Sequence, residues 1–197
     1  VIPVADEPHG VAVDPAGRTL FVLGTAFDAV SVVDLASGKE TKRLAASRNP
    51  WSAALSPDGK RLLVTNALSR FVKFRTPPMS EVTVVDVEGK RVEDRWVVPE
   101  SNLLLGVAWH PSGEFALATM NRTKNLVPMT RILQGWTITN GLAVLWKGGR
   151  VDQVLLDDFV DILLVDIGVP GAFRIHHDHR AIVAAVEAAG RVDAHLA

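Results

Sequence analysis

Short apolar segments alternate with polar turns along roughly the first 157 residues of the chain. The segments are four to six residues long and rich in Val, Leu and Phe, which is typical of half-buried β-strands. No segment before residue 175 keeps the 3.6-residue period of an amphipathic helix. The pattern therefore predicts an all-β fold for this part of the chain.

The same unit of strands and turns occurs three times. A Pro-x-Gly turn between two apolar strands recurs at Pro15, Pro57 and Pro111, with spacings of 42 and 54 residues. Proline fixes the φ angle of such a turn, and glycine accepts the positive φ that follows. The predicted strands of the three units are 10–13, 20–23, 30–34 and 40–44; 53–55, 62–65, 82–86 and 91–98; and 106–109, 115–118, 142–146 and 151–156.

Four antiparallel strands in each unit of about 42 residues match the blade of a β-propeller. The predicted fold is therefore a β-propeller of about three blades, an incomplete ring, because closed propellers have about four to eight blades. Residues 1–4 are expected to be the outer strand of a preceding blade. Open blade edges predict pairing with another chain or self-association.

In one propeller family, a tetrapeptide at this point of the repeat gives the family its name. The segment Leu62-Leu-Val-Thr-Asn66 lies at that point here. Over residues 1–157 the repeat resembles the YVTN-repeat propellers, which include lactonase-like and surface-layer-like seven-bladed proteins. The resemblance implies the fold and a location in the periplasm or at the cell surface. It brings no catalytic motif that can be transferred to this chain residue by residue, so we expect no catalytic residue.

Residues 158–197 depart from the repeat and form a divergent tail, which we interpret as foreign to the propeller. Residues 1–150 hold 18 Lys and Arg against 14 Asp and Glu, whereas residues 151–197 hold 3 against 8. Ala181 to Ala189, ended by Gly190, predicts a short helix. The run His176-His-Asp-His179 contains metal-binding side chains, but adjacent residues cannot all point inward, so we favour adventitious affinity over a metal site.

Composition narrows the chemistry further. The chain has no cysteine, which excludes disulfides, thiolate metal sites and covalently attached haem within it. A formal net charge of −1 gives no reason to expect nucleic acid as a partner. The chain has no 18-residue uncharged apolar run, so we expect no membrane insertion. No nucleotide or cofactor motif occurs, and we expect no cofactor.

Blade topology places the long, variable connections on one face and the tight turns on the other. Function tends to lie on long loops of a rigid scaffold. The loops carry several cations and aromatic rings, which suit a protein or a small anionic ligand. An ordinary solvated rim is the alternative. The candidate binding residues are His9, Trp51, Arg70, Lys73, Arg75, Asn121, Arg122 and Lys124.

Two of these candidates, His9 and Trp51, share one repeat position at the start of the innermost strand. We expect that they either line a central pocket or pack between blades. Trp109 and Trp136 are expected in the core between blades. Asn66 and Asn121 end equivalent strands, where turn capping explains them without a ligand.

Three functions remain open. The first, which we favour, is a non-enzymatic binding scaffold that uses the basic loop face. The second is a lactonase-like hydrolase, which would need carboxylates near His9. The third is a partner or subunit of a cytochrome-type redox protein.

Overall fold

The structure, a computed structural model, describes residues 1–123 and 138–155. By its internal contacts the chain divides into two units, Val1–Phe159 and Val160–Ala197. The second unit lies outside the described residues, and so do the predicted tail helix and the histidine run. Lys124 and Trp136 are also outside the described ranges. The predicted domain boundary and the foreign origin of the tail therefore stay predictions.

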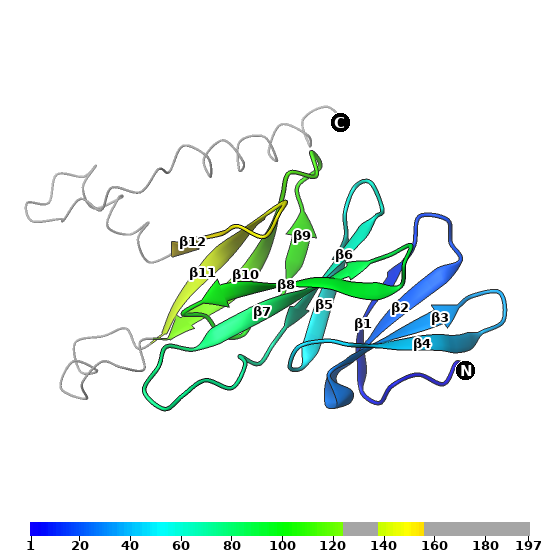
Figure 1. The fold of residues 1–197 in the computed structure, drawn as a ribbon, viewed down its shortest axis with the longest axis horizontal. Coiled ribbons are helices and arrows are strands. Elements are labelled where there is room, and N and C mark those ends of the chain that lie inside the picture. Colours follow the sequence, from blue (N-terminus) through cyan, green and yellow to red (C-terminus); the bar gives the residue numbers. More distant parts are fainter. Residues whose placement is uncertain (124–137, 156–197) are drawn as a thin grey trace, which may run out of the picture. The chain divides into compact units, whose positions relative to one another are not determined.

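Three four-stranded antiparallel sheets form the described part, as the repeat predicts. Each sheet follows the chain order from an inner to an outer strand (Figure 1). The first blade contains β1 (Pro8–Val13), β2 (Thr19–Gly24), β3 (Ala29–Asp34) and β4 (Lys39–Ala45), with the 3₁₀ turn η1 (Thr25–Phe27). The second contains β5 (Pro50–Leu55), β6 (Arg61–Asn66), β7 (Met79–Asp86) and β8 (Arg91–Pro99). The third contains β9 (Val107–Trp109), β10 (Phe115–Thr123), β11 (Ile138–Trp146) and β12 (Val151–Leu155).

The Pro-x-Gly turns repeat in detail as well as in sequence. Gly17, Gly59 and Gly113 have φ angles of 66°, 68° and 73°, the left-handed region that glycine adopts without strain. The side chain before each proline caps its own turn: the Asp14 carboxylate, for example, accepts from the backbone N–H of Arg18 at 2.7 Å. Successive turns also touch, because the Cα of Gly59 lies against the ring of Pro15. A Cβ at residue 59 would collide with that ring.

Apolar side chains fill the two seams between neighbouring blades. Strand alternation sends Leu62 and Val64 of the second blade toward Phe21 and Val32 of the first. Leu63 faces the other way, into a cluster with Ala118 and Leu145 of the third blade. Trp109 confirms its predicted place in this second seam, since it packs against that cluster and its indole N–H donates to the Ala54 carbonyl at 3.2 Å. The middle blade is thus buried on both of its faces, against the first blade on one side and the third blade on the other.

The prediction for the first four residues was wrong, because residues 1–7 form no strand. This segment lies instead on the face of the first blade that points away from the second. The backbone N–H of Ala5 donates to the buried hydroxyl of Ser31 at 3.1 Å, and the Cα of Gly24 lies against Ala5. The segment follows the blade face without completing a backbone ladder, and Ala5 is its one buried residue.

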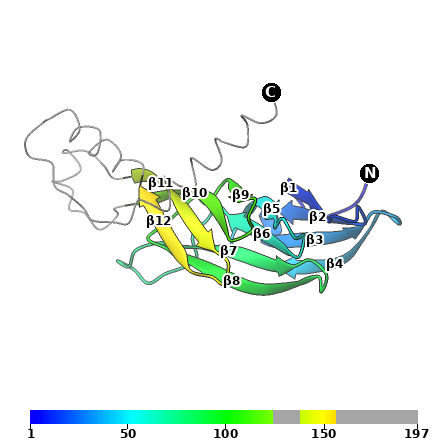
Figure 2. The ribbon, with the colours of Figure 1, turned by 90° about the horizontal axis from the view of Figure 1, so that it is seen from above.

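The described sheets form an open row and do not close into a ring. The inner strands β1, β5 and β9 lie side by side, as do the outer strands β4, β8 and β12 (Figure 2). This arrangement confirms the predicted incomplete propeller. It also places the connections β2–β3, β4–β5, β6–β7 and β8–β9 on one face, called the loop face below. The tight turns lie on the opposite face, called the turn face (Figure 1).

Candidate functional site

Backbone hydrogen bonds link the loop face from blade to blade. The Asp28 carboxylate accepts from the Asn49 backbone N–H at 2.6 Å, and the Asn49 carbonyl accepts from the Ala67 N–H at 2.8 Å. The Ala67 carbonyl in turn accepts from the Leu103 N–H at 3.1 Å. Asn102 and Asn121 exchange both of their backbone bonds, at 2.7 and 2.9 Å. The loops that the sequence assigned to one face therefore form one continuous surface.

A layer of buried polar side chains supports this surface from below. Asn66 is fully buried, and its amide N–H groups donate to the carbonyl of Glu81 at 2.7 Å and to the hydroxyl of Thr83 at 3.3 Å. The hydroxyl of buried Ser80 donates to the carbonyl of Ser101 at 2.9 Å. We predicted that Asn66 caps a turn. In the structure its buried side chain links β6 to β7. Buried bonds of this kind fix loop ends, because losing a partner leaves a costly unpaired group.

The connection between β6 and β7, residues 67–78, carries the most exposed aromatic side chains among the described residues of this face. Phe71 is 86% exposed and Phe74 is 90% exposed. The guanidinium carbon of Arg48 lies 4.0 Å from the ring centroid of Phe71, and that of Arg75 lies 5.5 Å from the ring centroid of Phe74. Both distances fall within the range of cation–π contacts. This loop brings candidate cations and rings together as the sequence suggested.

Two of the predicted cations are already paired with carboxylates. Arg70 forms an ion pair with Glu81 at 3.2 Å, and Arg122 forms one with Glu100. The sequence reading missed both acidic partners, because nothing in the local sequence places β7 or the β8–β9 connection beside these arginines. Lys73 and Arg75 are exposed and form no ion pair with any described residue. The outward-directed charge of the loop is therefore centred on residues 73–75.

Asn121 lies on the same face, and its side chain is hydrogen-bonded to the neighbouring strand. Its side-chain amide donates to the side-chain oxygen of Asn140 at 2.8 Å, across the β10–β11 pair. The Glu100–Arg122 pair lies at the same end of the described loop face. Lys124 was predicted to join this group and lies outside the described residues.

His9 and Trp51 meet at the inner edge of the blades. Their ring centroids are 3.7 Å apart, and the His9 Nδ1 lies 2.9 Å from the Trp51 carbonyl oxygen. Both residues sit at bulges, since the β1–β2 register shifts between Pro8 and Val11 and the β5–β6 register shifts between Pro50 and Ser52. A bulge redirects a side chain, which explains how the repeat turns both rings toward the same place.

These two rings line an open groove of about 290 Å³. Its other lining residues are Gly10, Val11, Ser52, Ala53, Leu105 and Gly106. The sequence left two possibilities for this position, the lining of a pocket or packing between blades. In the structure the two rings pack against each other and also line the groove. The described residues that line the groove include no carboxylate.

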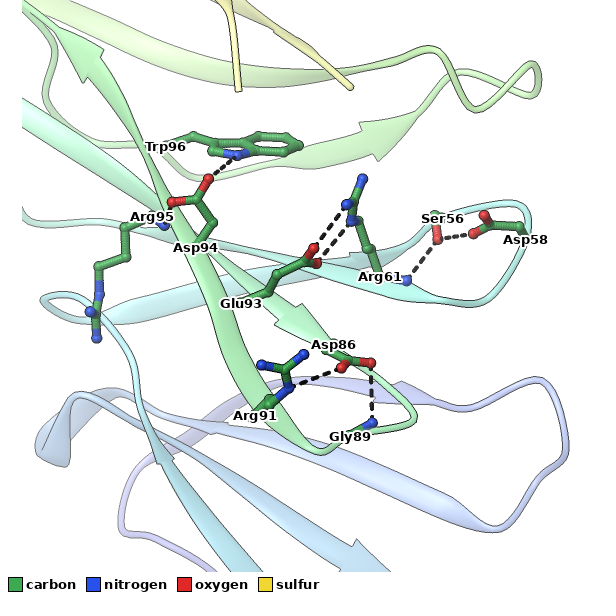
Figure 3. A network of polar contacts seen from close by, with 10 residues as sticks. All are labelled: Ser56, Asp58, Arg61, Asp86, Gly89, Arg91, Glu93, Asp94, Arg95 and Trp96. Atoms are coloured by element: carbon green, nitrogen blue, oxygen red, sulfur yellow. Dashed lines mark hydrogen bonds and ion pairs between the residues drawn. The ribbon is translucent and has the colours of Figure 1, made fainter. Parts of the chain in front are cut away.

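The turn face differs, because several of its carboxylates accept hydrogen bonds from neighbouring groups (Figure 3). Glu93 accepts two hydrogen bonds from Arg61, both 2.9 Å long, and these bonds lower the pKa of the Glu93 carboxyl below its ordinary value. The Ser56 hydroxyl donates to Asp58 at 2.6 Å and lowers the pKa of that carboxyl. Asp86 accepts from the Gly89 N–H and from Arg91, at 3.1 and 3.2 Å. These groups stabilise turns and leave little for a ligand.

No group of three or more metal-binding side chains occurs in the ranges that the structure describes. Within the same ranges, no helix has the length and hydrophobicity needed to cross a membrane.

Comparison with known proteins agrees with the blade geometry. Residues 5–96 match the model of the YNCE-like beta-propeller family. The blades are propeller blades. The predicted resemblance to repeat propellers is thereby confirmed for the fold.

Relatives extend this result beyond the family match. The chain is 28% identical over 142 residues to the hydrazine synthase subunit beta of Kuenenia stuttgartiensis, which covers 68% of this chain and 34% of that subunit. The solved hydrazine synthase of the same organism superposes with a TM-score of 0.65 at 26% identity, covering 76% of this chain and 42% of that one. This chain spans about a third of the length of the curated relative.

A second solved structure supports the fold alone. The Cps50 (Swd1) beta-propeller domain of Myceliophteria thermophila superposes with a TM-score of 0.53 at 15% identity. The superposition covers 78% of this chain and 40% of that one. The propeller fold is therefore shared with a protein of very different sequence.

Proposed function

We propose that this chain is a non-enzymatic propeller module that binds an anionic partner, foremost a protein, through its loop face. The observation that carries the proposal is the exposed loop 67–78, where Lys73 and Arg75 stand without carboxylate partners among the described residues. A surface of this kind attracts acidic groups and accelerates their association. The turn face also has exposed lysines outside the described ion pairs, such as Lys39 and Lys60, but carboxylates stand among its cations: the charges of Lys60 and Lys147 help to lower the pKa of Asp58.

The relative supports a role in a protein assembly. A protein that is named a subunit works together with other chains, and this chain is 28% identical to such a subunit over 142 residues. We extend this to a proposed location in the periplasm or at the cell surface, where propellers of the resembling family function.

The test uses a fluorescent poly-glutamate peptide as the probe and the full chain as the receptor. Lys73→Glu with Arg75→Glu reverses two exposed loop-face charges, and Lys39→Glu with Lys60→Glu reverses two exposed turn-face charges. Both variants change the net charge equally. We expect the loop-face variant to weaken binding about tenfold or more, roughly 1.4 kcal/mol, and the turn-face variant to change it less than about twofold. Equal effects, or no binding by the wild type, would overturn the proposal.

A more specific version of the proposal is that the protein partner is a cytochrome-type redox protein. An acidic cytochrome serves as the probe, because its haem absorbance reports retention on the immobilised chain. Retention at low ionic strength that is lost in the Lys73→Glu, Arg75→Glu variant supports this version. Equal elution from the chain and from a blank matrix contradicts it.

A further inference from the structure

The two phenylalanines of loop 67–78 are left outside the core although the fold has apolar seams on both sides of the second blade. Their exposures of 86% and 90% exceed those of the other exposed large hydrophobic residues described, apart from Val1 at the chain end. Burying one aromatic ring stabilises a protein by about 1.5–3 kcal/mol. Two rings in one loop that forgo this stabilisation mark an interaction surface.

The arginines beside these rings come from two different connections. Arg48 belongs to the β4–β5 connection, and its guanidinium donates to the Ser69 carbonyl at 2.7 Å while it lies over Phe71. Arg75 belongs to the loop itself and lies over Phe74. Each guanidinium lies within cation–π distance of its ring, and both rings stay largely exposed. Each phenylalanine is therefore paired with a cation whose position is set in advance.

Internal hydrogen bonds hold the loop that presents these pairs. Both the hydroxyl and the backbone N–H of Thr76 donate to the Lys73 carbonyl, at 2.6 and 3.1 Å. The Arg70 N–H donates to the Met79 carbonyl at 2.8 Å, which closes the base of the loop, and Pro78 is buried there. Arg75 has a φ of 62°, a conformation that its turn imposes. A loop held in this way loses less conformational entropy when a partner binds.

We propose that Phe71 and Phe74, with Arg48 and Arg75, are the anchors of a docking site for an acidic protein segment that carries apolar side chains between its carboxylates. This inference rests on the proposed function and assigns its partner chemistry and its central residues. Buried aromatic rings and arginines are the residue types that dominate binding energy at protein interfaces. The carboxylates of the partner meet the guanidinium edges, and its apolar side chains cover the ring edges.

A single-stranded nucleic acid would use the same residue types differently. Bases stack on open aromatic faces, and in this loop the Arg48 guanidinium already lies over one face of Phe71. The chain carries a net charge of −1. An acidic protein segment fits these observations better.

The experiment compares three labelled probes on the full chain by fluorescence anisotropy. Two are peptides of equal length and charge, one alternating Glu with Leu and one alternating Glu with Ser; the third is an oligothymidylate. The test variant is Phe71→Ser with Phe74→Ser. The matched control is Phe27→Ser, which removes a 58% exposed phenylalanine of η1 on the same face that has no arginine over its ring among the described contacts.

We expect the Glu–Leu peptide to bind about tenfold more tightly than the Glu–Ser peptide, and the double variant to remove this preference while Phe27→Ser keeps it. The oligothymidylate should bind more weakly than either peptide. Equal affinity for both peptides, or an unchanged preference in the double variant, overturns this inference while the proposed function stands. Tighter binding of the oligothymidylate also overturns it. If neither peptide binds the wild type, the proposed function itself fails.

Discussion

The two faces of the blade row are built from the same repeats but use their polar groups in opposite ways. On the turn face, Asp34, Asp58 and Glu93 accept hydrogen bonds from groups of their own blade, and the pKa of each carboxyl is lowered. On the loop face, buried groups such as Asn66 hold the base, and the tips carry exposed rings and cations. The polar groups of the turn face stabilise the fold, whereas those at the tips of the loop face are available to a partner.

The largest effect is expected at the base of the loop face. Asn66→Asp puts a carboxylate in a fully buried site and removes the donor to the Glu81 carbonyl, so it should reduce the free energy of unfolding by about 3–5 kcal/mol. Urea unfolding measures this loss. The matched variant Asn121→Asp, at the equivalent repeat position but with its side chain more exposed, should cost about 1 kcal/mol or less. Similar losses at both positions would contradict a buried anchor.

The next effect concerns the stacked turns of the turn face. Gly59→Ala places a Cβ against the Pro15 ring at a φ of 68°, so strain and collision should together cost about 2–4 kcal/mol. Gly17→Ala has a similar φ of 66° and nothing within 4 Å of the added carbon, so it should cost about 1 kcal/mol. The two thermal unfolding midpoints give the comparison. If they coincide, contact between successive turns contributes nothing.

A smaller effect should depend on pH. Arg61 holds the folded pKa of Glu93 below its ordinary value of 4.5, so this pair adds stability above that pH and loses it as the pH falls through the folded pKa. Glu93→Gln should therefore be destabilised by about 0.2–1 kcal/mol near neutral pH, with the difference from wild type vanishing in acid. Urea midpoints across the acidic range measure it. Glu88→Gln, which changes an exposed neighbour without a described ion pair, is the matched control.

The smallest effect sharpens the contrast at the loop tip. Phe71→Ser with Phe74→Ser should change the free energy of unfolding by less than about 0.5 kcal/mol per site, because both rings are almost fully exposed. Thermal unfolding of the variant against wild type provides the measurement. A loss above about 2 kcal/mol would mean that the rings support the fold and are not reserved for a partner.

Much of the fold could be predicted because the repeat is local. The Pro-x-Gly turns at Pro15, Pro57 and Pro111 fix where strands end, and the alternation of Leu62, Leu63 and Val64 fixes which side each strand buries. The first four residues were misread because an apolar segment next to a blade has the same pattern whether it pairs through its backbone or only covers a face. Backbone pairing depends on a neighbour that the segment itself does not specify.

The candidate site was predictable only in part. The sequence placed the cations of loop 67–78 on the loop face, since chain topology decides which connections share a face. It could not show that Arg70 and Arg122 are neutralised by Glu81 and Glu100, because those pairs join segments 11 and 22 residues apart. It also could not show that Arg48 crosses from another connection to lie over Phe71.

The sequence by itself determined the strands, the turns, the number of blades and the face that carries the long loops. These follow from hydrophobic alternation and turn residues, which act over a few neighbouring positions. Only the tertiary structure decided which charges are paired, that the bulges at His9 and Trp51 bring the two rings together, and that two phenylalanines stay exposed under arginines. Such contacts depend on distances between blades, and packing sets those distances after each blade has formed.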